Sequence, residues 1–383
     1  MPSNRLLKNA TRHADPAERE KHLLGLTENE SRSFASLRMT WRRELLSNLL
    51  REIAMKKWIW IALICGLAYF PNLSAQGPPL KLVGTIAMPG VRGRIDHLSV
   101  DVKGHRLFVS ALGNNTVEVL DLTSGKDIHS IGGMHEPQGV FYAPESNRIF
   151  VANGGDGVVR VLDGSSYRQL STVQLSSDAD DIRYDAAKKL IFVGYGSGGV
   201  AVLDALTGRE LGSIKLRGHA EAFEVENGGA RIYVNVPEAR EIAVAGWDRR
   251  SVIERWPMEK YRDNFPMAFD RAQHRLFVVC RRPAELLALD SRSGKVVAHL
   301  AVAGDADDVY YDEARRRIYV SGGQGAISVV DQVDADHYRL RMSIPTAPGA
   351  RTSFFVPQLD RFYLAVPRRG AQVAEIRIYT ANK

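Results

Sequence analysis

A pattern that repeats about every 42 residues runs through most of this 383-residue chain. Each copy begins with a short strand-like segment that carries one aromatic residue, and successive aromatics are 42, 42, 41, 44, 42 and 44 residues apart. A period of this length fits a four-stranded blade and exceeds a leucine-rich or ankyrin unit. The seven aromatics are Phe108, Phe150, Phe192, Tyr233, Phe277, Tyr319 and Tyr363.

A second landmark has the same period. A V-x-V-x-D segment follows the aromatic segment in most copies, and residues 147–175 show the full order of strand, turn, strand, turn and strand. Such a meander cannot bury both of its faces alone, so copies are expected to stack against one another. The aspartates of this second landmark are Asp121, Asp163, Asp204, Asp248, Asp290 and Asp331.

Glycine-rich turns are expected between the second and third strands of a blade. They occur at 113–115, 153–157, 196–199 and 321–325. Glycine supplies the positive φ that tight hairpins require, so these segments predict antiparallel connections.

The two ends of the repeat array complement each other. A fourth, outermost strand follows the third strand of the first six copies, but none follows the last third strand at 373–379. Residues 81–89 have the character of an outermost strand and precede the first copy. Pairing these two segments removes two exposed sheet edges. We therefore predict an all-β fold, a seven-bladed β-propeller with four antiparallel strands per blade, whose last blade is closed by the N-terminal strand.

The segment before the repeats has the features of a signal peptide. Met55 is followed by two lysines, an apolar run from Trp58 to Phe70, the helix breaker Pro71 and a small-residue cleavage site that ends at Ala75. The run is too short to span a membrane, which takes roughly 20 apolar residues. We therefore predict an upstream extension that is not part of the native protein at 1–54, a signal peptide at 55–75, and a propeller at 76–383 in a periplasmic or secreted protein.

Charge and cysteine content exclude several partners and cofactors. Most of the net charge of +7 belongs to residues 1–75, and the rest of the chain carries only +2. This balance gives no reason to expect nucleic-acid binding, and no membrane span is expected in the mature chain. Cys280 is the only cysteine after residue 75, so neither a disulfide nor a CxxCH haem site is expected. A buried position on a strand is expected for this thiol.

Polar residues gather in the loops that lead into the innermost strands. Counting back 11 to 14 residues from each aromatic places these loops at one mouth of the channel, together with the hairpins between second and third strands. Many of their carboxylates are expected to bond turn backbone. The expected rim comprises Arg94, Asp96, His97, Glu136, Asp178, Asp180, Asp181, His219, Glu221, Asp263, Asn264, Asp305, Asp307, Asp308 and Arg351.

The repeat resembles that of the YVTN-type β-propeller family. The resemblance rests on segments such as RIYVS and RIFVA, a Gly/Asn turn and a V-x-V-x-D strand, and it covers about residues 81–380. It implies an exported propeller. Relatives with this repeat include binding proteins, surface-layer proteins and enzymes, so the resemblance specifies fold more strongly than function.

We interpret the acidic rim as a binding surface for a small molecule, peptide or partner protein, and we expect a monomer. The alternative is a lactonase-like hydrolase, because similar seven-bladed lactonases place His, acidic and Arg groups at the channel mouth; the catalytic candidates are then His97, His219, Glu221 and Arg351. No cofactor is expected, with Ca²⁺ at Asp181 and Asp308 as a further hypothesis. The residues expected to bind the ligand are Asp96, His97, Glu136, Asp180, Asp181, His219, Glu221, Asp307, Asp308 and Arg351.

Overall fold

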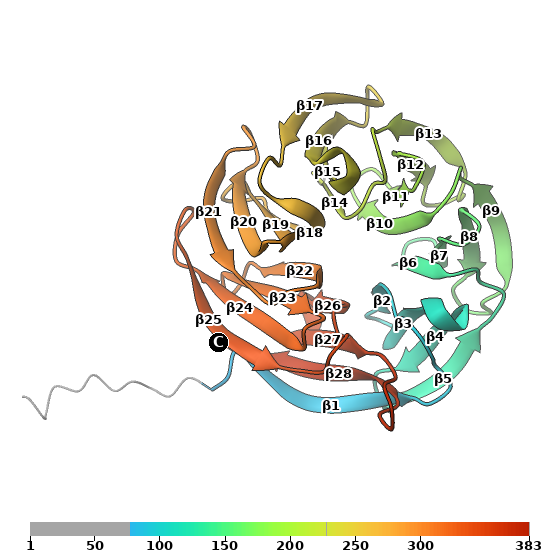
Figure 1. The fold of residues 1–383 in the computed structure, drawn as a ribbon. Coiled ribbons are helices and arrows are strands. Elements are labelled where there is room, and N and C mark those ends of the chain that lie inside the picture. Colours follow the sequence, from blue (N-terminus) through green and yellow to red (C-terminus); the bar gives the residue numbers. More distant parts are fainter. Residues whose placement is uncertain (1–76, 227, 383) are drawn as a thin grey trace, which may run out of the picture. The chain divides into compact units, whose positions relative to one another are not determined.

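The structure, a computed structural model, describes residues 77–226 and 228–382. Over these residues the chain forms seven four-stranded antiparallel sheets arranged in a ring (Figure 1). The predicted seven-bladed β-propeller is therefore confirmed. The extension predicted at 1–54 and the signal peptide predicted at 55–75 lie outside the described residues.

Blades one to three each use four consecutive strands, which run from the inside of the ring outward (Figure 1). Blade one contains β2 (Leu98–Asp101), β3 (Arg106–Ala111), β4 (Thr116–Asp121) and β5 (Lys126–Ile131). Blade two contains β6 (Pro137–Ala143), β7 (Arg148–Asn153), β8 (Val158–Asp163) and β9 (Gln169–Gln174). Blade three contains β10 (Ala179–Asp185), β11 (Leu190–Tyr195), β12 (Gly199–Asp204) and β13 (Glu210–Lys215).

Blades four to six follow the same order. Blade four contains β14 (Phe223–Val225), β15 (Arg231–Val236), β16 (Glu241–Gly246) and β17 (Ser251–Pro257). Blade five contains β18 (Arg262–Asp270), β19 (Arg275–Arg282), β20 (Ala284–Asp290) and β21 (Val296–Ala301). Blade six contains β22 (Ala306–Asp312), β23 (Arg317–Gly322), β24 (Ala326–Gln332) and β25 (Tyr338–Pro345).

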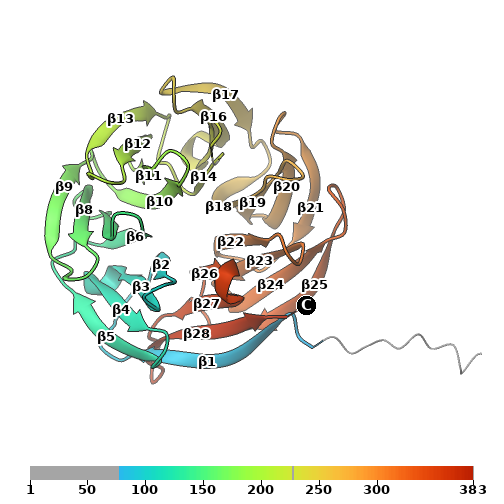
Figure 2. The same cartoon turned by 180° about the vertical axis from the view of Figure 1, so that it is seen from behind.

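Blade seven joins the two ends of the described chain. It contains β26 (Ser353–Val356), β27 (Arg361–Val366), β28 (Ala374–Ala381) and β1 (Leu80–Met88), in that order from the inside outward. The N-terminal strand pairs antiparallel with the C-terminal one along its whole length, and the two lie side by side in both views (Figures 1 and 2). The predicted ring closure is confirmed.

Short 3-10 helices connect the second and third strands in blades one and four, and the first and second strands in blade seven. They are η1 (Leu112–Asn114), η2 (Pro237–Ala239) and η3 (Pro357–Leu359). No helix within residues 77–226 and 228–382 has the length and apolar character needed to cross a membrane.

The aromatic landmarks form the packing between blades. All seven lie on second strands and are at most 2% exposed, because each packs between its own blade and the next one around the ring. Tyr233, for example, packs against Trp256 of its own blade and Phe269 of the next, with ring centroids 5.7 and 5.5 Å apart. Cys280 lies on β19 and is fully buried, as predicted.

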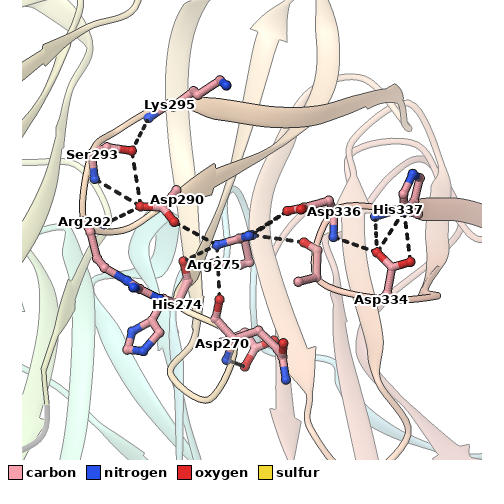
Figure 3. Close-up of polar contacts among 12 residues, drawn as sticks. Asp270, His274, Arg275, Asp290, Arg292, Ser293, Lys295, Asp334, Asp336 and His337 are labelled. Carbon is pink, nitrogen blue, oxygen red and sulfur yellow. Dashed lines mark hydrogen bonds and ion pairs between the residues drawn. The ribbon is translucent and has the colours of Figure 1, made fainter.

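In blades one, two, three and five the aspartate landmark stabilises the turn that follows the third strand, as Figure 3 shows for blade five. Asp331 of blade six instead accepts hydrogen bonds from Arg339 and Arg341. Asp290 Oδ1 accepts the backbone N–H groups of Arg292 and Ser293 at 2.9 and 3.1 Å. Gly294 then adopts a φ of 71°. The same figure shows Arg275 donating to Asp290 and, across the blade boundary, to Asp336 at 2.6 Å. The turn chemistry therefore also links neighbouring blades.

One predicted turn forms differently. At 113–115 the residue with positive φ is Asn115, at 56°, rather than a glycine. Asparagine is one of the few other residues that tolerate the left-handed region. Its side-chain oxygen is also used, because it accepts the backbone N–H of Glu136 from blade two at 2.7 Å.

Candidate functional site

The loops that lead into the innermost strands lie beside the hairpins between second and third strands. Backbone hydrogen bonds join them: Gly113 donates to Arg94, and Gly323 donates to Asp305, both at 2.9 Å. The two loop types therefore share one mouth, as the repeat register predicts.

A polar cavity of about 510 Å³ opens at this mouth. We call it the upper cavity. Its size is that of a small-molecule site, but its wall carries many more charges than the mostly apolar wall typical of such sites. Its lining residues are Arg94, Gln138, Asp178, Asp180, Gly196, His219, Glu221, Pro237, Glu238, Asp263, Phe265, Arg281, Asp307 and Arg351.

One wall of the upper cavity is built around His219, from the loop before β14. Its Nε2 lies 3.2 Å from Asp180 Oδ2, and its Nδ1 lies 3.4 Å from Asp178 Oδ2. Gln138 donates to the other oxygen of Asp178 at 2.7 Å. Asp180, His219 and Glu221 each offer a ligand atom, and these atoms lie within 4.8 Å of one another.

The pKa values on this wall reflect crowded carboxylates. Burial lowers the pKa of His219, but Asp180 and the neighbouring carboxylates outweigh it and raise that pKa to about 9. Burial, followed by repulsion from Asp180, raises the pKa of Glu221 to about 8. For Asp180 burial acts in the raising direction, but the hydrogen bond from His219 and the charge of His97 prevail and lower the pKa of this carboxyl. In the absence of another cation, His219 and Glu221 therefore retain their protons near neutral pH.

The facing wall carries three arginines, each paired with a carboxylate. Arg281 donates to Asp307 Oδ1 at 2.6 Å, and Arg351 Nε lies 3.2 Å from Asp307 Oδ2. Arg94 Nη2 lies 2.7 Å from Asp96 Oδ2. The charges of these arginines are therefore largely satisfied inside the protein.

Below the upper cavity the channel narrows to a waist with a void of only about 20 Å³. This volume holds about one water molecule. His97 lies in the waist; its Nε2 is 3.7 Å from Asp96 and 3.9 Å from Asp180, and its Nδ1 is 3.9 Å from Asp308. One imidazole therefore faces carboxylates from three blades.

The waist carboxylates and His97 shift one another's ionisation. Burial lowers the pKa of His97, but Asp96, Asp181, Asp308 and Asp180 together raise it to about 9. Burial raises the pKa of Asp308 to about 7 and that of Asp96 to about 6, against the opposing charge of His97. The His97 imidazolium and the Arg94 guanidinium thus both offset the charge of the buried carboxylates around the waist.

A second cavity of about 400 Å³ lies on the other side of the waist. Aromatic side chains from blades two, three, five, six and seven line it together with a few charged groups. The shared residues His97 and Asp181 separate it from the upper cavity. Its aromatics are Phe141, Tyr184, Phe269, Tyr310, Tyr311 and Phe354.

The structure brings together some of the predicted site residues and separates others. His219, Glu221 and Arg351 line the upper cavity, whereas His97 lies in the waist. Glu136 is exposed and lines neither cavity nor the waist. Four of the remaining predicted residues, Asp96, Asp180, Asp181 and Asp307, line the upper cavity, the waist or both. Asp308 lines the second cavity, on the other side of the waist.

The two predicted calcium ligands are occupied by protein groups. Asp181 bonds Arg183, and Asp308 Oδ2 accepts the backbone N–H of Ser353 at 2.7 Å. Both line the second cavity, and a Ca²⁺ site there stays a prediction.

Several residues that line the upper cavity are not among those predicted from the sequence. Arg281 lies near the end of β19, and Glu238 lies in η2; the repeat count places both at the mouth but does not orient their side chains. The Arg281 guanidinium lies over the ring of Phe265 at 4.1 Å, a cation–π contact between neighbouring strands of blade five. The doubled arginine after Cys280 was the only available signal.

Comparisons with known proteins bear on the fold. No protein-family model and no curated protein sequence matches the chain. A chain of the hydrazine synthase of Kuenenia stuttgartiensis is similar, with a TM-score of 0.66 and 16% identity over 80% of this chain and 99% of that one. A chain of the mitotic checkpoint complex has a TM-score of 0.67 and 12% identity over 79% and 92%. The chain shares their fold. Sequence identities this low support only a shared fold, so the resemblance to the YVTN-type family stays a prediction.

Proposed function

We propose that this is an exported binding protein whose upper cavity captures positively charged groups of a small molecule, peptide or partner protein. One observation carries the proposal: the lining of this cavity holds six carboxylates against three arginines and one histidine. Carboxylates that line a concave, low-dielectric wall concentrate their field and attract cations.

The excess negative charge lies on the His219 wall. Within the described chain, no arginine or lysine forms an ion pair with Asp178, Asp180 or Glu221. The arginines of the facing wall are held by Asp96, Asp305 and Asp307 instead. A cationic ligand would therefore meet carboxylates that lack a permanent positive partner. The signal peptide expected at 55–75 supports a periplasmic or secreted location for this binding.

A thermal-shift screen of the full chain tests the proposal, with diamines, polyamines and guanidinium compounds in the presence of EDTA. At about 100 times its Kd, a ligand adds roughly 2.7 kcal/mol, which corresponds to a melting-temperature rise of about 5 to 10 °C. We expect Glu221→Gln and Asp178→Asn to weaken binding at least about tenfold, because each removes a carboxyl group that a bound cation would hold in its ionised form.

The matched control is Glu313→Gln, which removes the same charge from an exposed turn outside the cavity. It should leave affinity unchanged. Equal binding of anions and cations, or equal affinity in Glu221→Gln and the parent chain, would contradict the proposal.

The hydrolase alternative is supported by one arrangement: His219, Glu221 and Arg351 line the same cavity. In that case the His219 imidazole, which is neutral only above its raised pKa of about 9, would act as a general base at alkaline pH, and Arg351 would hold a substrate carboxylate. A positioned base contributes about 10² to 10⁴ in rate, so His219→Ala should reduce lactone hydrolysis by at least 100-fold. A lactone panel without any hydrolysis sensitive to this substitution rules the alternative out.

A further inference from the structure

Asp180, His219 and Glu221 come from adjacent blades and meet at one point of the upper cavity. Asp180 lies on β10 of blade three, and the other two lie on the loop before β14 of blade four. One ligand atom from each lies within 4.8 Å of the others, and His219 Nε2 is 3.2 Å from Asp180 Oδ2. Two oxygens and one imidazole nitrogen in such a group match the donor types and number of a three-residue metal site.

The histidine is held in the orientation that a metal ligand needs. Its Nε2 faces Asp180, while its Nδ1 faces Asp178 Oδ2 at 3.4 Å. Asp178 is itself held by Gln138, and the backbone N–H of His219 donates to Glu238 at 3.2 Å. Histidines that bind metals usually donate their second ring N–H to a carboxylate in this manner, which fixes ring orientation and tautomer.

Glu221 supplies an independent observation. Its side chain lines both the upper cavity and the waist and is only partly exposed. Its backbone N–H donates to Asn235, but its carboxylate makes no hydrogen bond or ion pair with residues of the described chain. A partly buried carboxylate without a partner is costly, whereas a bound cation would satisfy it.

The donor set discriminates between metals. Ca²⁺ and Mg²⁺ prefer oxygen ligands only, and Ca²⁺ takes six to eight of them. An imidazole combined with two carboxylates suits Zn²⁺ and its neighbours in the first transition series. We propose that Asp180, His219 and Glu221 bind a divalent transition metal ion of the Zn²⁺ class, with Asp178 as the positioning residue of His219. The inference rests on the proposed function, because the ion is one form of the cation that the upper cavity would capture.

The test uses metal alone, added to the chelator-treated full chain. Co²⁺ reports its ligands through visible absorption, so we expect a 1:1 spectral change that Zn²⁺ displaces. His219→Ala and Glu221→Gln should each weaken Co²⁺ binding by at least 10-fold, and Asp178→Asn by about 10-fold, as expected for a ligand orienter. Melting curves without metal confirm that each variant folds.

His135→Ala is the matched control, because the His135 side chain is 61% exposed and is not one of the three proposed metal ligands. It should leave the Co²⁺ spectrum and affinity unchanged. Failure to bind Co²⁺ or Zn²⁺ below about 1 mM, or equal binding by the parent chain and His219→Ala, overturns the metal site. If the metal site fails but organic cations still bind in EDTA, the proposed function stands. If metal binds but no organic cation does, the metal site stands and the proposed capture of organic cations fails.

Discussion

We expect the protein to melt about 10 to 20 °C lower once residues 81–89 are deleted. The deletion removes most of β1, which closes blade seven by pairing with β28. Ile86 and Met88 are at most 1% exposed in this strand, and burial of two such side chains contributes about 3 to 6 kcal/mol. Each kcal/mol shifts the melting temperature of a domain of this size by roughly 2 to 4 °C, and the lost strand pairing adds to the effect.

Thermal unfolding by circular dichroism measures this effect, and two point variants control for it. Ile86→Ala should reproduce a part of the loss, whereas Val83→Ala, on the same strand but 51% exposed, should change the melting temperature by less than about 2 °C. A deletion variant that melts within a degree or two of the intact chain would contradict the ring closure.

The second large effect concerns His97 and pH. The folded-state pKa of about 9 lies above the ordinary value of 6.5, so the His97 charge stabilises the fold fully below pH 6.5. This contribution is lost as pH rises through 9. A shift of this size corresponds to roughly 3 kcal/mol. We therefore expect His97→Gln, which cannot carry the charge, to cost about 3 kcal/mol at pH 6 and less than about 1 kcal/mol at pH 9.5.

Denaturant unfolding in EDTA, repeated across that pH range, measures the difference. Asp308 and Asp96 change the stability of the parent chain in the same direction but at lower pH, because their raised pKa values remove stability as pH rises from 3.8 to about 6 and 7. His337→Ala removes an exposed histidine and should show no such dependence. A difference between His97→Gln and the parent that is constant with pH would mean that His97 acts through packing alone.

The sequence is sufficient to predict the architecture because most repeats carry two landmarks, each with one structural role. The aromatic fills the space between blades, and in four blades the aspartate accepts backbone N–H groups of the turn after the third strand. Tyr363 and Asp290, for example, take the places that the period assigns to them. The ring closure also followed from the sequence, since an array with one strand missing at its end and one extra at its start has a single economical pairing.

The strand register also places three channel residues at equivalent positions in different blades. Ser99, Arg183 and Tyr310 each lie opposite the landmark aromatic of their own blade. Two residues before them come His97, Asp181 and Asp308. These three occupy equivalent positions in blades one, three and six, so they reach the channel at one level.

The pairing of side chains across the channel could not be read from the repeat. Arg281 reaches Asp307 because β18 and β19 of blade five extend further toward the mouth than the inner strands of other blades. No periodic feature signals that extension. For the same reason the sequence does not show that Asp180, and not its neighbour Asp181, lies beside His219 and Glu221. This depends on side-chain directions, which only the three-dimensional structure provides.

The most direct test of the account is a crystal structure of the full chain with the cation that binds most tightly in the screen. We expect density for its positively charged group in the upper cavity, within hydrogen-bond or ion-pair distance of Asp178, Asp180 or Glu221. Density confined to the aromatic cavity below the waist or to the outer surface, with the upper cavity holding only water, would contradict the central claim that this acidic wall is the binding site.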